Sequence, residues 1–518
     1  MAAAAISAPV PDERPASYAD RIGSEVVGRK SATHRKEIGI YLTLVEVADF
    51  VAGAFENDRS SVRILDPAAG SGTLICALVE ALARRSEPIR PRDMELVAYE
   101  IDGELAEALR VAINYLTRWA ALRTISLRAT VKRQDFVLEN AGGLRSTGVL
   151  FDRRDYTPFD LVVANPPYFK IPKSDPRAQP ATSVVHGQPN IYALFMAASA
   201  ALLREGGELA FITPRSFTSG AYFRVFRERF FASVRLVSVH IFNSRRDAFG
   251  RDDVLQENII VRGIRDDAWH QNARRATLVV SSSHGVADLK NLVRRSMPLT
   301  SALDMSSTDR VLRLPILEGE HEAVRLVDSW PASLHEYGLN ISTGPVVPYR
   351  ATKFLRMASV SSAVLVPLIW MHHVHAMRVR WPNEARKPQY IQIGHAERSL
   401  LVPNRNYVLL RRFSAKEEAR RLVAAPWINS NNPSQLLGIE NHLNYIHRPG
   451  SELEEDEAWG LAALLNSSLL DTYFRVSSGN TQVSAIELRA IPLPPARRSC
   501  ESDATPENLT TAMSDWMT

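Results

Sequence analysis

Residues Asn165, Pro166, Pro167 and Tyr168 have the chemical types needed to hold a planar amino group. They directly follow the apolar run 159–164, which is typical of a buried strand. The Asn165 side-chain oxygen and the Pro166 carbonyl can accept the two amine hydrogens, while proline restrains the loop and offers no competing donor. The ring of Tyr168 is then free to stack on the base that carries the amine. An ordinary turn after a strand is the alternative explanation.

A glycine-rich turn with the sequence DPAAGSGT occupies residues 66–73, between a short apolar strand and a helical stretch. Its glycines, Gly70 and Gly72, let the backbone approach a ligand closely, and the helix N-terminus favours an anionic group. The turn lacks the Lys-Ser/Thr ending of a nucleotide P-loop and the full spacing of a dinucleotide fingerprint. Taken alone, it fits a cofactor loop and a tight strand–helix turn equally well.

Acidic residues follow the next two expected strands. Glu100 ends the second strand, where an acid can accept from both hydroxyls of a ribose. Asp135 follows the third strand, where it can accept from an adenine amine while the apolar Phe136 covers the ring. Each acid alone also fits a solvated residue at a strand end. Together with Asp66 and Asn165, however, they are expected to line one edge of one sheet.

From about residue 29 the chain alternates short apolar strands with helical stretches. Strands are expected at 62–65, 94–99, 126–132, 159–164, 208–212, 234–242 and 258–262, and helices at 72–85, 103–116 and 191–204. This alternation predicts an α/β fold, a doubly wound Rossmann-like sheet with ligands at the strand C-terminal ends. The last two strands are expected to form an antiparallel closing pair.

The alternation of strands and helices stops after about residue 263, which predicts a second domain of mixed α+β structure. We therefore expect a first domain at 29–265 and a second at 266–499, in agreement with a length of 518 residues. The Ala/Pro-rich residues 1–28 are expected to be a disordered tail, and the polar residues 500–518 a loose one.

Composition narrows the class of protein. The net charge of +5 permits nucleic-acid binding without demanding it. Cys76 and Cys500 are the only cysteines, which argues against a disulfide framework and against a Cys-based zinc site. Residues His372, His373 and His375 lack a fitting acidic or Cys partner, so we expect no metal site. A cytoplasmic protein without membrane spans is predicted.

The ordered motifs resemble the gamma group of S-adenosylmethionine-dependent DNA adenine-N6 methyltransferases, over the whole α/β half. The resemblance implies that the loop containing Asp66, Ala68 and Gly70 surrounds the methionine part of the cofactor, that Glu100 holds its ribose, and that Asp135 with Phe136 holds its adenine. The segment GIYLTL at 39–44 is similar to the N-terminal cofactor motif of the family. Thr43 is then expected near the cofactor carboxylate, although Leu44 stands where many relatives have proline.

Strings in the C-terminal half resemble the PstI/BsuBI-type modification methylases: VLQENII at 254–260, STGPVV at 342–347, LNSSLL at 465–470 and SGNTQVSA at 478–485. This resemblance implies that the second domain recognises a target in double-stranded DNA. It also implies a type II restriction-modification system, in which the chain, expected to be a monomer, works beside a separate endonuclease or alone.

In the family the target adenine is flipped out of the duplex. It would stack on Tyr168 and on a second aromatic residue, for which Phe249 is the candidate; a loop phenylalanine packed on the core is the alternative. Phosphate contacts would suit the basic side chains Arg224, Arg227, Arg229, Arg235, Arg245, Arg246 and Arg251, and a solvated helix face is the alternative explanation. Arg350 and Lys353 are candidates for contacts of the target-recognition domain.

Other functions remain compatible with the motif. The same turn occurs in methyltransferases that act on RNA adenine or on a protein glutamine amide, and a catalytically inactive DNA-binding relative is a further alternative. The large C-terminal domain argues against the first two, and the intact set Asp66, Glu100, Asp135 and Asn165 argues against the third.

Overall fold

A computed structural model of the chain describes residues 6–31, 35, 39, 41–140, 157–178, 190–244, 257–357, 365–383, 387–392, 400–414, 418–431, 434–478 and 482–495. The chain divides into two compact units, Met1–Ile316 and Leu317–Thr518. Within the described ranges, no helix is both long and apolar enough to cross a bilayer.

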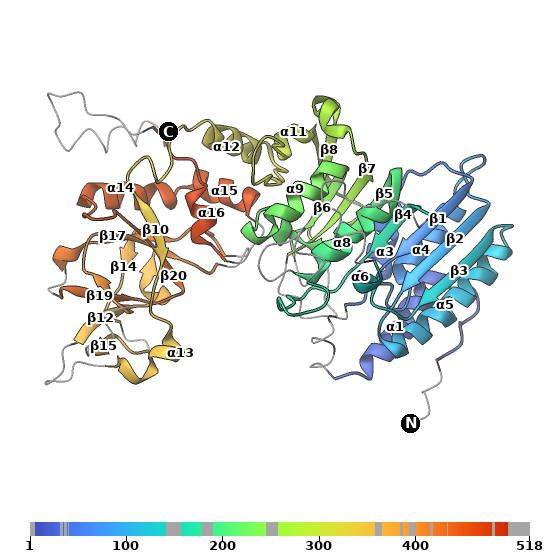
Figure 1. Cartoon of the computed structure of the whole chain (residues 1–518), viewed down its shortest axis with the longest axis horizontal. Helices are drawn as coiled ribbons and strands as arrows, with labels where there is room; N and C mark the ends of the chain where they lie inside the picture. The colour runs from blue at the N-terminus through green and yellow to red at the C-terminus, as the bar shows by residue number, and fades with distance from the viewer. Residues whose placement is uncertain are drawn as a thin grey trace. The chain divides into compact units, whose positions relative to one another are not determined.

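A nine-stranded sheet forms the centre of the first unit, in the order β3-β2-β1-β4-β5-β7-β6-β8-β9 (Figure 1). Strands β3, β2, β1, β4 and β5 pair in parallel with one another, whereas β7 is antiparallel to both β5 and β6. The doubly wound α/β prediction and the antiparallel pairing of β6 with β7 are therefore confirmed, but this pair does not close the sheet, because β8 and β9 follow it. The strands are β1 Ser61–Asp66, β2 Asp93–Tyr99, β3 Ser126–Lys132, β4 Phe159–Ala164, β5 Leu203–Pro214, β6 Val234–Phe242, β7 Asn258–Arg265, β8 Thr277–Ser283 and β9 Val293–Pro298.

Helices cover both faces of this sheet because successive strand side chains point to opposite sides. Val162 packs in one hydrophobic cluster, and its neighbours Leu161 and Val163 pack in the other. All six residues of β4 are buried, as expected for a central parallel strand. One face carries α1 Pro15–Gly28, α3 Val45–Ala52, α4 Thr73–Ala83 and α5 Gly103–Ala121; the other carries α6 Phe136–Glu139, α8 Ile191–Leu202 and α9 Arg224–Ser233.

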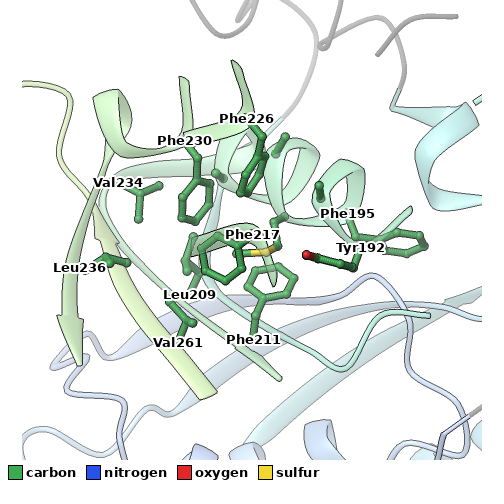
Figure 2. Packing of buried hydrophobic residues seen from close by; sticks show 14 of the residues in the cluster. Tyr192, Phe195, Leu209, Phe211, Phe217, Phe226, Phe230, Val234, Leu236 and Val261 are labelled. Carbon is green, nitrogen blue, oxygen red and sulfur yellow. The ribbon is translucent and has the colours of Figure 1, made fainter. Parts of the chain in front are cut away.

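Aromatic side chains fill the core beneath α8 and α9 (Figure 2). Phe226 stacks on Phe230 with ring centroids 5.1 Å apart, and Phe217 meets Phe226 edge-on at 5.8 Å. Phe211 of β5 belongs to the same cluster and is fully buried. This packing fixes β5 against the helices, and with it the strand end that lies beside the candidate site.

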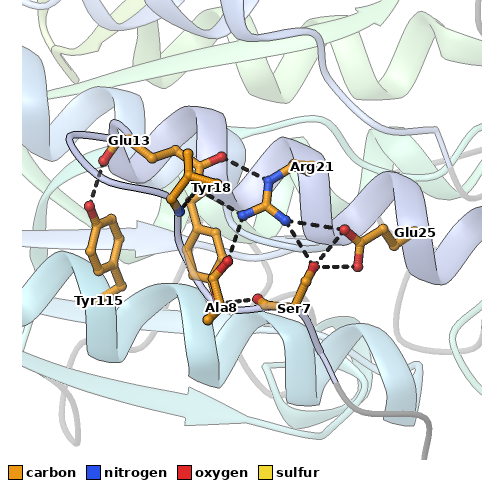
Figure 3. A network of polar contacts seen from close by, with 8 residues as sticks. Ser7, Ala8, Glu13, Tyr18, Arg21, Glu25 and Tyr115 are labelled. Carbon is orange, nitrogen blue, oxygen red and sulfur yellow. Dashed lines mark hydrogen bonds and ion pairs between the residues drawn. The ribbon is translucent and has the colours of Figure 1, made fainter.

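The expectation of a disordered tail over residues 1–28 is wrong for the part that the structure describes. Residues 15–28 form α1, which buries Tyr18 and Ile22 against α4 and α5. Arg21 and Glu25 of α1 both bind Ser7, which anchors the preceding segment as well (Figure 3). Proline suits the first turn of a helix, so Pro15 starts α1 rather than breaking it.

The first unit also extends further than the sequence analysis expected. The boundary was placed at 265, but the compact unit continues to Ile316. Strand β8 pairs in parallel with β6, and β9 pairs with β8, so residues 277–298 enlarge the same sheet. The alternation of helices and strands thus ends near residue 263, but the compact unit does not.

The second unit combines small sheets with helices, which confirms the mixed α+β expectation. A four-stranded antiparallel sheet has the order β10-β20-β17-β18, and a five-stranded sheet has the order β11-β15-β12-β19-β16. Their strands are β10 Asn340–Thr343, β20 Leu443–His447, β17 Tyr407–Arg411, β18 Ala424–Trp427, β11 Leu355–Arg356, β15 Tyr390–Gln392, β12 Leu365–Ile369, β19 Leu436–Ile439 and β16 Val402–Pro403. The longer helices are α12 Glu318–Asp328, α14 Glu455–Leu465 and α15 Ser468–Ser477.

A buried ion pair joins β5 to β7 and provides a test of this sheet. Arg262 donates to Glu208 at 3.0 Å, and their side chains are 5% and 8% exposed. Arg262→Met should lower the free energy of unfolding by about 3–5 kcal/mol, because it leaves a buried carboxylate without its cation. Adding Glu208→Gln should recover part of this loss by removing the charge. Urea denaturation measures both effects, and a double variant no more stable than Arg262→Met would contradict this account.

Candidate active site

The predicted site residues follow the carboxyl ends of four adjacent parallel strands. Asp66 ends β1, Glu100 follows β2, Asp135 comes after β3, and Asn165 follows β4. Since β3, β2, β1 and β4 are neighbours in this order, these four residues lie along one edge of the sheet. The structure therefore has the arrangement along one edge that the strand-end pattern predicted.

The glycine-rich turn wraps closely around the end of β1. Gly70 and Gly72 adopt φ values of +57° and +96°, which residues with a side chain rarely adopt. A Cβ at position 72 would lie 2.8 Å from Leu109, so the helix packs too closely for any larger residue. The Gly70 amide donates to Glu100 at 2.9 Å. Turn and acid are thus one hydrogen-bonded unit.

Helix α1 supports this turn from behind. A Cβ at Gly23 would collide with the side chain of Ser71, so α1 lies directly against the turn. Lys30, just beyond α1, forms an ion pair at 3.0 Å with Asp102, the N-cap of α5. Composition predicted a tail for this part of the chain. In the structure, α1 instead supports the glycine-rich turn.

Two carboxyl groups, the buried Asp66 and the half-buried Glu100, accept hydrogen bonds from amides of the turn. Burial raises the pKa of Asp66 to about 8, opposed by the Ala68 amide, which donates to it at 3.1 Å. Burial likewise raises the pKa of Glu100 to about 7, opposed by the backbone amides of Asp102 and Gly70. The second oxygen of Asp66, Oδ2, is buried with no hydrogen-bond partner among the described residues. A buried acceptor of this kind fits a cationic or hydrogen-donating ligand group.

Asp135 caps helix α6 and faces an arginine that sequence analysis did not single out. Its Oδ1 accepts from the Leu138 amide at 2.9 Å, and its Oδ2 lies 3.6 Å from Arg177. Arg177 also pairs with Asp175 at 2.6 Å. It therefore links Asp135 to the loop that follows the Asn-Pro-Pro-Tyr turn. Nothing in the sequence distinguishes this arginine from the many others.

Phe136 lies deeper than its expected role implies. Its side chain is 1% exposed, stacks on Phe195 at 5.4 Å and meets Tyr99 edge-on at 5.1 Å. In this conformation the ring contributes to the floor of the site rather than to an open surface.

The side chain of Asn165 is held by three hydrogen bonds. Its Nδ2 donates to the Tyr41 carbonyl and to the Thr43 hydroxyl, both at 3.1 Å. Its Oδ1 accepts from the Tyr168 hydroxyl. The half-buried asparagine is thus ordered before any substrate is present, and its accepting oxygen is directed at a hydrogen donor.

Tyr168 is buried and turned inward. Its hydroxyl donates to Asn165 and lies 3.1 Å from the Ile212 carbonyl, and burial raises its pKa well above the usual value. Its ring stacks on Tyr41, with centroids 5.6 Å apart and planes inclined by 18°, and meets Tyr192 edge-on at 6.3 Å. Tyr41 therefore covers one face of the Tyr168 ring, a contact the sequence did not indicate.

The remaining predicted contacts have different outcomes. Phe249, Arg245, Arg246 and Arg251 lie outside the described residues. The expectation that Arg227 contacts phosphate is wrong. Arg227 is 1% exposed and donates to the carbonyls of Phe217, Gly220 and Asp309. Cys76 is fully buried in α4.

Comparison with known proteins identifies the family. Residues 113–249 match the family model of the Eco57I restriction-modification methylase. The type II methyltransferase M.PstI of Providencia stuartii is 32% identical over 464 residues, covering 89% of this chain and 88% of the relative. M.BsuBI of Bacillus subtilis is 30% identical over 468 residues, with the same coverage of both chains.

Among solved structures, the type IIG restriction endonuclease BpuSI is similar at 14% identity and a TM-score of 0.43, covering 96% of this chain and 62% of that chain. The two type II methyltransferases match both units of this chain at 30% identity or more. The chain therefore belongs to the family of type II restriction-modification DNA methyltransferases that includes M.PstI and M.BsuBI.

Proposed function

We propose that this enzyme methylates N6 of an adenine flipped out of double-stranded DNA, as the modification component of a type II system. The observation that carries the proposal is the orientation of Asn165 at the end of β4. Its Oδ1 already accepts from a hydroxyl, and its Nδ2 is committed to two protein acceptors. An acceptor fixed in this way suits an exocyclic amine.

The catalytic part of the proposal uses Asn165, Pro166, Pro167 and Tyr168. The Asn165 oxygen and the Pro166 carbonyl accept the two hydrogens of the amine and draw its nitrogen towards tetrahedral geometry. The nitrogen lone pair is otherwise delocalised into the ring. In the tetrahedral geometry it can accept the methyl group directly, and the site promotes this step by positioning and electrostatics. Pro167 restrains the loop. No nucleophilic side chain is required.

The Tyr168 hydroxyl occupies the acceptor that the amine needs, so the two donors exchange when the base enters. Because burial keeps its pKa well above the usual value, this hydroxyl stays protonated and remains a donor at neutral pH. Stacking of the base on the face of Tyr168 that Tyr41 covers would require Tyr41 to move away. Phe249 is retained as the candidate for the second stacking residue.

The cofactor in this proposal is S-adenosylmethionine, which supplies a methyl group on a positively charged sulfur. Asp66, Ala68 and Gly70 would hold its methionine part, with the unpartnered Asp66 Oδ2 accepting from the ammonium group. Glu100 would accept from the ribose hydroxyls. Asp135 would accept from the adenine amine, above the ring of Phe136, and Thr43 would lie near the carboxylate.

The second unit is proposed to recognise the DNA target. Its segment 346–357 carries Arg350, Lys353 and Arg356 without any acidic residue, and Tyr349 beside them is 75% exposed. Such a segment suits phosphate and base contacts. We further propose that the enzyme acts as a monomer in the cytoplasm and that any cognate endonuclease is a separate chain.

RNA adenine and a protein glutamine amide are the alternative substrates for the same clamp. Methyl-labelled cofactor offered to duplex DNA, RNA and a protein extract distinguishes them, because only the true substrate gains label. Sequencing of modified bases in DNA from cells that express the protein should then find N6-methyladenine at one short site. Label in RNA or protein alone would contradict the proposal.

Asn165→Ala should lower the rate of methyl transfer by about 10²- to 10³-fold, the usual effect of removing one preorganised polar contact. Affinity for cofactor and DNA should stay near that of the wild type, since the acidic residues and the second unit are unchanged. Incorporation of tritiated methyl groups under single-turnover conditions measures the rate. A near-wild-type rate would exclude the proposed role.

Cofactor affinity should rise between about pH 6 and about pH 8, because Asp66, with a pKa of about 8, must lose a proton to receive an ammonium group. Asp66→Asn should weaken binding by at least about tenfold, the equivalent of 1.4 kcal/mol, and flatten this dependence. Calorimetry across the pH range measures both. Unchanged affinity in the variant would refute the assignment.

The same substitution should have the opposite effect on the ligand-free fold. The raised pKa means that protonated Asp66 stabilises the fold at acidic pH and that this contribution is lost as the pH rises through about 8. Asp66→Asn should therefore melt higher than the wild type at alkaline pH, with little difference at acidic pH. Thermal denaturation without cofactor, in matched buffers, provides the comparison.

A further inference from the structure

Gly39, Tyr41 and Thr43 make close contact with the loop that carries Asn165. Gly39 has φ +65°, and a Cβ there would lie 3.0 Å from Pro167 and 3.1 Å from Phe169. Tyr41 stacks on Tyr168 just beyond this contact. Two parts of the chain more than a hundred residues apart thus pack together, with the backbone of Gly39 against the loop that carries Asn165. Only glycine permits this approach at position 39.

This packing brings two acceptors to the amide nitrogen of Asn165. The Tyr41 carbonyl and the Thr43 hydroxyl oxygen each lie 3.1 Å from Nδ2. A carbonyl can only accept, so the amide nitrogen must face Tyr41; the reverse orientation would place the amide oxygen against the Tyr41 carbonyl oxygen. The oxygen of Asn165 is therefore directed away from this segment and towards Tyr168.

We infer that Thr43 is a positioning residue for catalysis, which holds the Asn165 amide so that its oxygen faces the substrate amine. The inference rests on the proposed function of Asn165. Thr43 is 6% exposed, so its contact with Nδ2 is shielded from water. Losing it leaves Nδ2 with one acceptor instead of two and allows the side chain to rotate.

The expected role of Thr43 beside the cofactor carboxylate is a different one. A hydroxyl oxygen that accepts from Asn165 can still donate its own hydrogen, so both contacts are compatible. They differ in what they control. A contact with the cofactor alone affects cofactor affinity, whereas the contact with Asn165 affects the rate once cofactor and DNA are both bound.

The test compares Thr43→Val, which keeps the shape and removes the hydroxyl, with Thr43→Ser, which keeps the hydroxyl. At saturating cofactor and DNA, the single-turnover rate should fall about 3- to 10-fold in Thr43→Val, the effect of one hydrogen bond, and return to within about twofold in Thr43→Ser. Calorimetry of cofactor binding is measured in parallel. Thr218→Val is the control for a buried hydroxyl, because the Thr218 hydroxyl has no partner among the described residues.

The outcomes separate the inference from the proposed function. If Asn165→Ala is inactive but Thr43→Val keeps the wild-type rate, the positioning role is wrong while the role of Asn165 stands. A weaker cofactor affinity with an unchanged rate also overturns the inference. If Asn165→Ala itself remains active, the proposed function fails. Melting temperatures close to the wild type, together with the Thr218→Val control, show that a lower rate does not come from a loss of folding. Equal rate losses in Thr43→Val and Thr43→Ser would contradict the role of the hydroxyl.

Discussion

The parallel pairing of β3, β2, β1 and β4 is the constraint on which the rest of the site depends. Parallel strands end at the same edge, so strand pairing brings residues separated by thirty or more positions in the chain to that edge. Asp66, Glu100, Asp135 and Asn165 are each placed by their own strand end. The helices and the aromatic core keep the strands in register, and the turns after the strands supply the chemistry.

The edge is also electrostatically strained. Two carboxyl groups, the buried Asp66 and the half-buried Glu100, lie beside one glycine-rich turn, and desolvation raises the pKa of both. Backbone amides offset only part of this cost. Burying a carboxylate without a cation is unfavourable, so a ligand that brings positive charge or hydrogen donors relieves a penalty that the fold alone carries. Binding and stability are thus opposed at the same residue.

At the other end of the site the polar groups are satisfied by the protein itself. Each hydrogen-bonding atom of the Asn165 side chain has a partner, and the ring of Tyr168 is covered by Tyr41. This arrangement avoids leaving a half-buried amide without partners before substrate arrives. Under the proposed function, an entering base would have to displace the Tyr168 hydroxyl from the Asn165 oxygen.

The sequence by itself determined the local features: β3, β4 and β6 had the expected bounds, because apolar runs bounded by turn residues specify a strand locally. It also determined which residues stand at strand ends. It could not show that α1 supports the glycine-rich turn, that β8 and β9 extend the sheet, or that Arg227 is buried, because each depends on partners distant in the chain. Only the tertiary structure decided that Tyr41 and Thr43 hold Asn165, since hydrogen bonds between positions more than a hundred residues apart leave no local pattern.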